Sequence, residues 1–436
     1  MKRLFALLAA LLLLTASAAA LEPVKRPVSN GGYTHYAIDG DGTLWSWGDS
    51  FHGGITAEVD PVLWEDAVPE VKHAVYAESG FLAGFAVDRD GVLWGWGSDF
   101  QGKLCGQSGR QGAVRLMDHV VSVHDMTECV VALKDDGTLW TWGGYDSETE
   151  TFRMPEQIMD QVRAFWGNYI QLESGTWVER RSAEDGETLL LPVAVNAAEV
   201  SYDYAADALL MLGENGGLYR AVRKGDWYGT PELLLENVVC FHGGLGPTAV
   251  TVEGTLWSWG RGRPAILKDG APDSEDAYNG DLPDKELAVP VKIMEGVRYA
   301  EATEDCTLAI LEDGSLWELP SAYHVSIQEE YPQDRFPEIR TECRKLMEQA
   351  GEVSWMEIDP NAPAPELLEM PDALREKPEA ETEVPVETPR EEPAETPAVE
   401  ETPLSTAERG PVFWAALAVS LLPLAAAVCF QWKKRR

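Results

Sequence analysis

The phrase Asp41-Gly42-Thr43-Leu44-Trp45-Ser46-Trp47-Gly48 recurs along this chain of 436 residues and decides its fold. It returns in three close copies and three weaker ones, so that seven glycines anchor the series: Gly42, Gly91, Gly137, Gly175, Gly216, Gly254 and Gly314. Successive anchors are 38 to 60 residues apart. A unit repeated at such a period indicates a repeat architecture, in which each copy needs its neighbours to bury its apolar faces.

Each copy divides into short strands. An apolar run such as Phe81–Val87 precedes the anchor, the Leu-Trp-x-Trp run follows it, and the Asp-Gly pair between them is a strong hairpin signal. A third run, such as Pro290–Val297, lies further upstream. Three or four strands in each of seven copies predict an all-β, seven-bladed β-propeller. Because a blade is buried on both faces, this fold also accounts for the 16 Trp residues.

The repeat phrase resembles the repeats of the regulator of chromosome condensation family. The nearest match is Gly32-Tyr33-Thr34-His35-Tyr36-Ala37-Ile38 followed by Asp41–Gly48, and the similarity covers roughly Val28 to Pro320. The resemblance implies a seven-bladed propeller. Only His35 occupies the family's His position, and the copies around Gly175 and Gly216 lack the second Trp.

The family's nuclear founder catalyses nucleotide exchange on a small GTPase and docks on chromatin, whereas a secreted bacterial relative inhibits β-lactamase. This chain has a formal net charge of -38, with 73 acidic residues against 35 Lys and Arg. Such an excess repels phosphate backbones and excludes nucleic acid as a partner. The resemblance therefore favours a protein-binding role over a chromatin role.

Both ends of the sequence carry targeting signals. Residues 1–20 have the charged, apolar and small-residue regions of a secretory signal peptide, and 411–432 form an uncharged span before the basic tail 433–436. Residues 359–410 repeat Pro, Glu and Thr, which predicts a semi-rigid stalk without a core. We expect the propeller, 21–358, outside the cell on a single-pass membrane anchor with a cytoplasmic C-terminus.

The ring has to close, and the segment after the last repeat is the candidate. Residues 337–349 have a Pro near their start and Gly351 beyond their end, which predicts a short helix. The run Val353–Glu357 follows and is predicted to be a strand that closes the ring and covers an open sheet edge.

Motifs for chemistry are missing from the sequence. It has no Gly-x-Ser-x-Gly, His-Glu-x-x-His or Cys-x-x-Cys, so we predict no catalytic residue, no metal site and no cofactor. The acids of Asp39–Gly42 and Asp88–Gly91 are interpreted as hairpin-turn residues, with calcium binding as the alternative. The extracellular cysteines are interpreted as thiols without a disulfide framework. The aromatic residues outside the repeat phrase that remain as ligand candidates are Trp64, Trp166, Tyr169, Trp227 and Tyr228.

The longest gap between anchors contains the acidic insertion Asp269–Glu286. We expect an exposed loop there that either is only solvated or steers a basic partner electrostatically. The candidate partner-binding residues are Asp273, Glu275, Asp276, Tyr278, Asp281 and Asp284. The predicted function is a non-enzymatic recognition module at the cell surface that binds an extracellular protein or polymer through rim loops. A hydrolase of extracellular glycan or peptide and a purely structural stalked protein are the alternatives.

Overall fold

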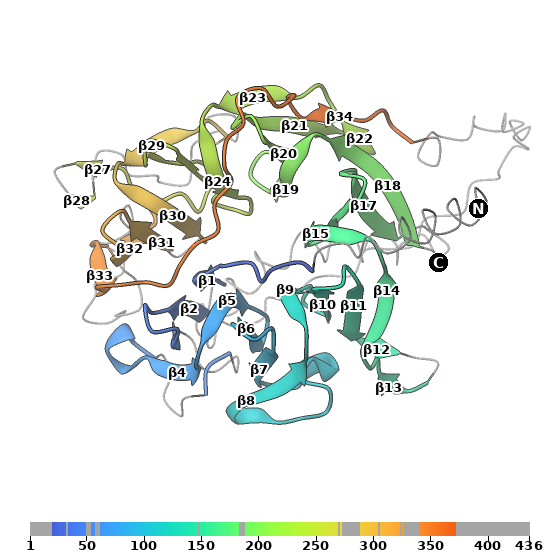
Figure 1. Ribbon diagram of the computed structural model, residues 1–436. Helices are drawn as coiled ribbons and strands as arrows, with labels where there is room; N and C mark the ends of the chain where they lie inside the picture. Colours follow the sequence, from blue (N-terminus) through green and yellow to red (C-terminus); the bar gives the residue numbers. More distant parts are fainter. Residues whose placement is uncertain are drawn as a thin grey trace, which may run out of the picture. The chain divides into compact units, whose positions relative to one another are not determined.

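The computed structural model describes residues 20–31, 34–48, 54–56, 62–146, 149–182, 188–268, 271–272, 288–303, 306–322, 325 and 341–371. These residues form seven antiparallel sheets arranged as blades around a central axis (Figure 1). The predicted seven-bladed, all-β propeller is therefore confirmed. In each blade the first strand in the sequence lies next to the axis and later strands lie progressively further out.

The first three blades have four strands each. Blade 1 contains β1 (Val28–Asn30), β2 (Thr34–Ile38), β3 (Leu44–Gly48) and β4 (Val68–Val71). Blade 2 contains β5 (Ala74–Ser79), β6 (Ala83–Asp88), β7 (Leu93–Gly97) and β8 (Gly109–Met117). Blade 3 contains β9 (Val120–Asp125), β10 (Cys129–Lys134), β11 (Leu139–Gly143) and β14 (Glu156–Met159).

The next two blades have five strands each. Blade 4 contains β15 (Val162–Trp166), β16 (Tyr169–Leu172), β17 (Trp177–Ser182), β18 (Thr188–Val195) and β34 (Glu366–Leu367). Blade 5 contains β19 (Ala197–Asp203), β20 (Ala208–Gly213), β21 (Leu218–Lys224), β22 (Trp227–Tyr228) and β23 (Glu232–Leu235).

The last two blades return to four strands. Blade 6 contains β24 (Val238–His242), β25 (Thr248–Thr251), β26 (Leu256–Ser258) and β29 (Val291–Met294). Blade 7 contains β30 (Val297–Ala302), β31 (Cys306–Leu311), β32 (Leu316–Pro320) and β33 (Arg344–Met347). Outside the blades lie two short hairpins and two 3-10 turns: β12 (Tyr145–Asp146) with β13 (Thr151–Phe152), β27 (Leu267–Lys268) with β28 (Ala271–Pro272), η1 (Trp64–Asp66) and η2 (Phe100–Gly102).

The repeat phrase builds the hairpin between the second and third strands. The Oδ1 atom of Asp39 accepts hydrogen bonds from the backbone N–H groups of Asp41 and Thr43, and its Oδ2 atom accepts one from Trp45 Nε1 at 2.8 Å. Asp88 makes the same three contacts in blade 2. Gly42 has φ +83, which a residue with a Cβ adopts only at a cost. These acids are thus turn residues, as the sequence predicts.

The two Trp residues of the phrase have different roles. The first lies over the turn, whereas the second is fully buried at Trp96, Trp142 and Trp259. Each buried indole donates from Nε1 to an acceptor in a neighbouring segment, as Trp142 does to Lys103 O at 2.8 Å. Blades 1, 2, 3 and 6 carry this second Trp, and its large apolar surface packs adjacent sheets together, whereas blades 5 and 7 have Ala221 and Leu319 at the same position.

Short links join the blades. The link residues His73, His119, Gln161, Asn196 and Asn237 all have positive φ, and Gly296 takes the same role. The residue after the link donates its N–H to the anchor glycine of the preceding blade, for example Val120 N to Gly91 O at 2.9 Å. A run such as Pro290–Val297 is therefore not one strand: it contains β29, the outermost strand of blade 6, then the link, and then the first residue of β30, the innermost strand of blade 7.

The predicted mode of closure is wrong. The described part of 337–349 contains β33, the outer strand of blade 7, in place of a helix, and Val353–Glu357 has no ladder partner. The ring closes instead through Ala350, which bridges Asp39, while Ile38 accepts from Gly351 N and donates to Pro27 O. Two segments therefore pair with the inner edge of β2 in blade 1: residues 27–30 near the N-terminus and residues 350–351 after the last blade. Periodicity alone missed this because each piece is only two or three residues long.

Two terminal segments cross the face that holds the Asp-Gly turns. We call Leu21–Arg26 the N-terminal strap and Ala350–Met370 the C-terminal strap, and we call this face the strapped face. In the N-terminal strap, Leu21 N donates a hydrogen bond to Asp135 O of blade 3, and Arg26 N donates one to Val75 O of blade 2. The C-terminal strap donates from Met356 N to blade 6, from Asp359 N to blade 5 and from Leu368 N to blade 4. The opposite side, where the innermost strands end, is the open face.

Candidate functional site

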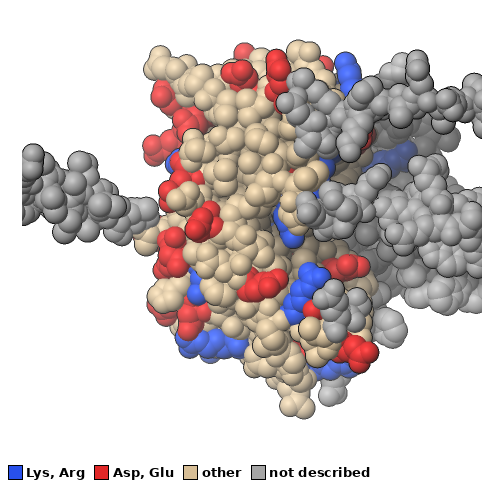
Figure 2. Space-filling model, turned by 90° about the vertical axis from the view of Figure 1, so that its right-hand side faces the viewer, with Lys and Arg blue, Asp and Glu red and all other residues tan. Residues whose placement is uncertain are grey.

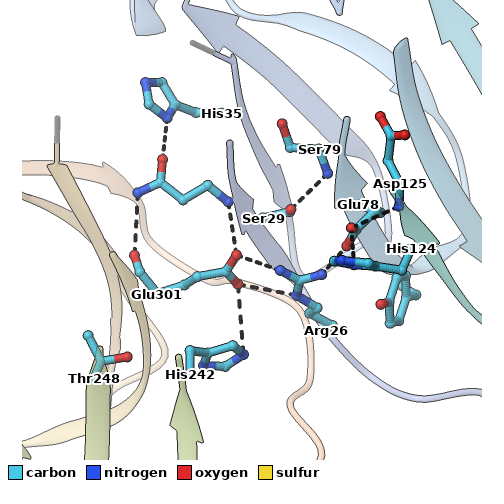
Figure 3. A network of polar contacts seen from close by, with 12 residues as sticks. Arg26, Ser29, His35, Glu78, Ser79, His124, Asp125, His242, Thr248 and Glu301 are labelled. Atoms are coloured by element: carbon cyan, nitrogen blue, oxygen red, sulfur yellow. Dashed lines mark hydrogen bonds and ion pairs between the residues drawn. The ribbon is translucent and has the colours of Figure 1, made fainter. Parts of the chain in front are cut away.

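A buried arginine lies at the centre of the ring. Arg26 comes from the N-terminal strap, and its guanidinium pairs with Glu78 of blade 2 and Glu301 of blade 7 (Figure 3). The Nε–Oε2 distance to Glu301 is 3.2 Å, and the guanidinium carbon lies 5.1 Å from the ring centre of Trp166. The three charged side chains are at most 8% exposed. One cation therefore holds two carboxylates from blades 2 and 7, the two neighbours of blade 1.

The axial residues occupy equivalent positions in their strands. On the second strand of each blade, Phe85 pairs with Glu78, Val131 pairs with His124 and Leu308 pairs with Glu301. Each of these second-strand residues also pairs with the central residue of the third strand in its blade. His124 Nδ1 lies 2.6 Å from Glu78, and Tyr299 forms a 2.9 Å hydrogen bond with His242 Nε2. We call Arg26 together with the residues around it the axial cluster; they are Glu78, His124, Trp166, His242, Tyr299 and Glu301.

Burial changes the proton affinity of several groups near the axis. It lowers the pKa of His242 to about 4, and the nearby negative charge of Glu301 only partly offsets this. Burial acts to raise the pKa of Glu78, but the neighbouring His124 and Arg26 outweigh it, so the pKa lies below its ordinary value. Burial also raises the pKa of Glu199 on β19 to about 7, with Arg26 opposing the shift. The axial cluster thus links the N-terminal strap to side chains of several blades through buried ion pairs and hydrogen bonds.

The acidic insertion falls outside the described residues. Asp273, Glu275, Asp276, Tyr278, Asp281 and Asp284 all belong to residues 273–287, whose placement the structure does not describe. Their proposed role remains a prediction. Among the residues that the structure does describe, no group of three or more His, Cys, Asp or Glu side chains is arranged to hold a metal ion.

The predicted aromatic candidates divide among several places. Trp166 is part of the axial cluster. Trp64 packs edge-on against Trp47 with ring centres 4.9 Å apart. Tyr169 and Tyr228 share a 2.9 Å hydrogen bond between their hydroxyl groups, and Trp227 donates to Leu368 O of the C-terminal strap. The structure therefore does not bring these five residues together, and each has a packing role.

The five described cysteines are not joined to one another by disulfide bonds, as predicted. Cys240 and Cys306 are buried, and Cys105, Cys129 and Cys343 are partly buried. Burial, followed by the negative charge of Glu199, raises the pKa of Cys240 to about 12. A thiol with such a pKa stays protonated at neutral pH and is a poor nucleophile.

Sequence reasoning missed a row of exposed aromatic side chains on the open face. Phe81 lies between β5 and β6 and meets Phe100 of η2 edge-on, with ring centres 5.7 Å apart. Phe152 lies over Gly102 of the same turn and meets Tyr145 edge-on at 6.0 Å. Their exposed fractions run from 37% for Phe100 to 56% for Tyr145. We call these four residues the aromatic ridge. They lie outside the repeat phrase, so periodicity gave no signal for them.

A small hollow adjoins the ridge at Phe81. It has a volume of about 210 Å³ and is lined by Thr34, Ser79, Asp125 and Thr127 together with Gly31, Gly54, Gly80, Phe81 and Leu82. The three glycines keep it open, because a Cβ at Gly80 would lie 2.1 Å from Asp125 Oδ2 and one at Gly31 would lie 1.8 Å from Ser79 Oγ. Beneath it, Asp125 pairs with the fully buried Lys103 at 2.8 Å.

Acidic side chains are concentrated on the strapped face. In Figure 2, Asp and Glu gather along the left edge of the ring while the middle of the view is mostly uncharged. The exposed acids of the turns and links are Asp41, Asp90, Asp118, Asp136, Asp160, Glu173, Glu214, Glu236, Glu253, Glu295, Asp313 and Glu348. This arrangement follows from the repeat, since each copy places an acid in its turn or its link.

Comparison with known proteins gives solved structures of weak similarity. No family model and no curated protein match the chain. Similar solved structures include Prp20p of Saccharomyces cerevisiae, studied for its binding to Gsp1p and histones, with 14% identity over 67% of this chain and 70% of that chain and a TM-score of 0.37. Yeast RCC1 (Prp20) bound to Kap60 gives 14% identity over 67% and 68% of the two chains, with a TM-score of 0.38. Human WBSCR16 gives 17% identity over 69% and 77%, with a TM-score of 0.35. The seven blades, each built on one copy of the repeat phrase, agree with the predicted RCC1-like propeller.

Proposed function

We propose that this chain is a recognition module at the cell surface that binds a protein through the open face of its propeller. The observation that carries the proposal is the unequal use of the two faces. The straps contact all seven blades on the strapped face, whereas the open face carries the aromatic ridge and the hollow beside it. Exposed apolar groups gathered at one place mark interaction sites more often than singly scattered ones do.

The surface location rests on the sequence. Residues 359–370 belong to the C-terminal strap, so the predicted stalk, 359–410, can begin only after them. The signal-peptide pattern of 1–20, the remaining Pro-, Glu- and Thr-rich sequence up to 410 and the apolar span of 411–432 support an extracellular propeller on a single membrane anchor. In the part of the chain that the structure describes, no helix has the length and apolarity needed to cross a membrane, and 411–432 lies outside that part.

The axial cluster supports binding over hydrolysis. Its two carboxylates, Glu78 and Glu301, would be the obvious acid pair at the centre of a propeller, yet both are paired with Arg26. A general acid or base needs access to substrate and a pKa close to the working pH. These groups stabilise the ring instead, so the open face is the better place for function.

The test is a photo-crosslinking amino acid placed on either face of the full-length chain, expressed in cells. We expect capture of a partner from Tyr145 on the open face and none from Asp313 on the strapped face. Protease added to intact cells should cut the propeller and spare a C-terminal tag. Capture from Asp313 alone, or a propeller shielded from protease, would refute the proposal, and hydrolysis of a glycan or peptide by the purified chain would favour the enzyme alternative.

A further inference from the structure

The four rings of the aromatic ridge form one continuous feature across blades 2 and 3. Phe81 contacts Phe100, η2 carries both Phe100 and Gly102, and Gly102 lies under Phe152, which contacts Tyr145. Gly144 N donates to Gln101 O at 2.8 Å, which ties η2 of one blade to the third strand of the next. The ridge is therefore held by backbone contacts between blades, and partner binding does not have to order it first.

Acidic groups surround the ridge. The segments that build it carry the exposed Glu128 and Glu150, and Arg153 is the exposed base among their described residues. Asp99 and Asp146 lie there too, but they are partly buried and accept hydrogen bonds from Leu104 N and Thr149 Oγ1. Lys103 contributes no free charge, because it is fully buried and paired with Asp125. An apolar ridge with an excess of carboxylates at its margins complements a segment that alternates basic and apolar side chains.

The hollow beside Phe81 offers little to a sugar. Thr34 Oγ1 and Ser79 Oγ bond to each other at 3.0 Å, and Asp125 accepts from Phe81 N, Thr127 N and Lys103 Nζ. Polar groups that are already paired in this way are poor partners for sugar hydroxyls. A volume of about 210 Å³ instead suits one side chain of a protein partner.

We propose that the aromatic ridge and the adjoining hollow bind an extended, basic segment of a partner protein, whose apolar side chains pack on Phe81, Phe100 and Phe152 and whose Lys or Arg side chains pair with the flanking acids. This inference rests on the proposed function and names its partner chemistry. The site lies on blades 2 and 3, whereas the acidic insertion that the sequence singled out belongs to the chain between β26 and β29 of blade 6.

The probe is a display library of random dodecapeptides selected against the purified full-length chain. We expect the enriched peptides to carry net positive charge together with Leu or aromatic residues. The affinity of the best peptide should fall at least tenfold in the Tyr145→Ser/Phe152→Ser double variant. It should also fall severalfold in Glu128→Lys, and it should weaken as salt rises. The hairpin of β12 and β13 lies outside the blade sheets, so the double variant should keep the melting temperature of the parent.

The matched control is Tyr204→Ser in blade 5, which removes another exposed aromatic side chain, 65% exposed, from the open face. It should leave the affinity unchanged. Enriched peptides that are acidic or neutral, an affinity that responds equally to ridge and control variants, or a library with no binder would overturn the inference. So would a surface polysaccharide that binds the ridge in place of peptides. If the open-face crosslinker at Tyr145 still captures a partner whose binding ignores the ridge substitutions, this inference fails and the proposed function stands.

Discussion

The strapped face and the open face are built from different parts of the repeat. The strapped face consists of Asp-Gly turns and links such as Asp118-His119, which recur with nearly the same geometry from blade to blade. The open face includes connections between third and outer strands, such as 98–108 in blade 2 and the residues 259–268 that follow β26 in blade 6, which differ in composition. The turns are alike because they build the ring, whereas the connections differ between blades and are where a repeat protein can acquire binding specificity.

The two faces also differ in their tolerance of change. A substitution that breaks the strapped side or the axis should damage stability and leave binding intact in the molecules that remain folded. A substitution on the aromatic ridge should weaken partner binding and leave the stability of the propeller unchanged. The predictions below test that separation.

The largest effect should come from Arg26. Changing Arg26→Met leaves Glu78 and Glu301 buried without their cation, which should cost about 3–5 kcal/mol of unfolding free energy in a denaturant titration. The adjacent Lys25→Ala is the control, because the Lys25–Glu352 pair is 47% and 79% exposed and should contribute less than about 1 kcal/mol. Equal losses from both variants would show that the axial cluster has no special role.

The next effect concerns the C-terminal strap. Replacing 353–368 by a Gly/Ser linker of equal length removes the packing of Val353, Met356 and Leu367 while keeping the closing residues Ala350 and Gly351. At about 1 kcal/mol for each half-buried apolar side chain, the loss should be about 2–4 kcal/mol. Peptide binding at the ridge should not change, and calorimetry on the same sample can measure both quantities. A loss of binding would mean that the two faces are coupled.

Much of this architecture could be predicted from the sequence, because the repeat phrase fixes a hairpin and its period fixes the number of blades. The assignment of outer strands failed because a single left-handed residue, such as His73 or Asn237, divides what looks like one continuous run. His and Asn are enriched at positive φ, but each also occurs in many other conformations. Closure failed for a related reason, since Pro27–Asn30 and Ala350–Gly351 are too short to show a pattern.

Part of the axial cluster could have been predicted from the sequence, because Glu78, His124 and Glu301 each precede their anchor glycine by 13 residues and so occupy equivalent positions. Arg26 was not, because it precedes the first repeat. The ridge was also beyond prediction, since Phe81 and Phe152 come together only through η2, whose packing no periodic pattern describes. The repeat therefore predicts the ring of blades but gives no information about residues outside the repeat pattern, such as Arg26 and the aromatic ridge.

A smaller effect should appear in the pH dependence of stability. The folded-state pKa of Glu199, about 7, is above its ordinary value of 4.5, so the folded state holds the proton more tightly and stability falls as pH rises through this window. His242 has the opposite effect, since its folded-state pKa of about 4 is below its ordinary value of 6.5 and stability rises with pH across that range. Glu199→Gln should therefore gain on the order of 1 kcal/mol relative to wild type between pH 5 and pH 8. Parallel stability profiles for the two proteins would contradict this assignment.

The smallest effect should come from the exposed ion pairs of the strapped face. Arg115–Asp118 and Lys345–Glu348 occupy equivalent positions in blades 2 and 7, each joining an outer strand to the link acid three residues later. Both partners of the first pair are at least half exposed, so water and salt screen the attraction. Arg115→Ala should change the unfolding free energy by less than about 0.5 kcal/mol, and the difference should vanish in molar salt. A loss as large as that of Arg26→Met would mean that the acidic surface of the strapped face holds the ring together, and the division of labour between the two faces would have to be abandoned.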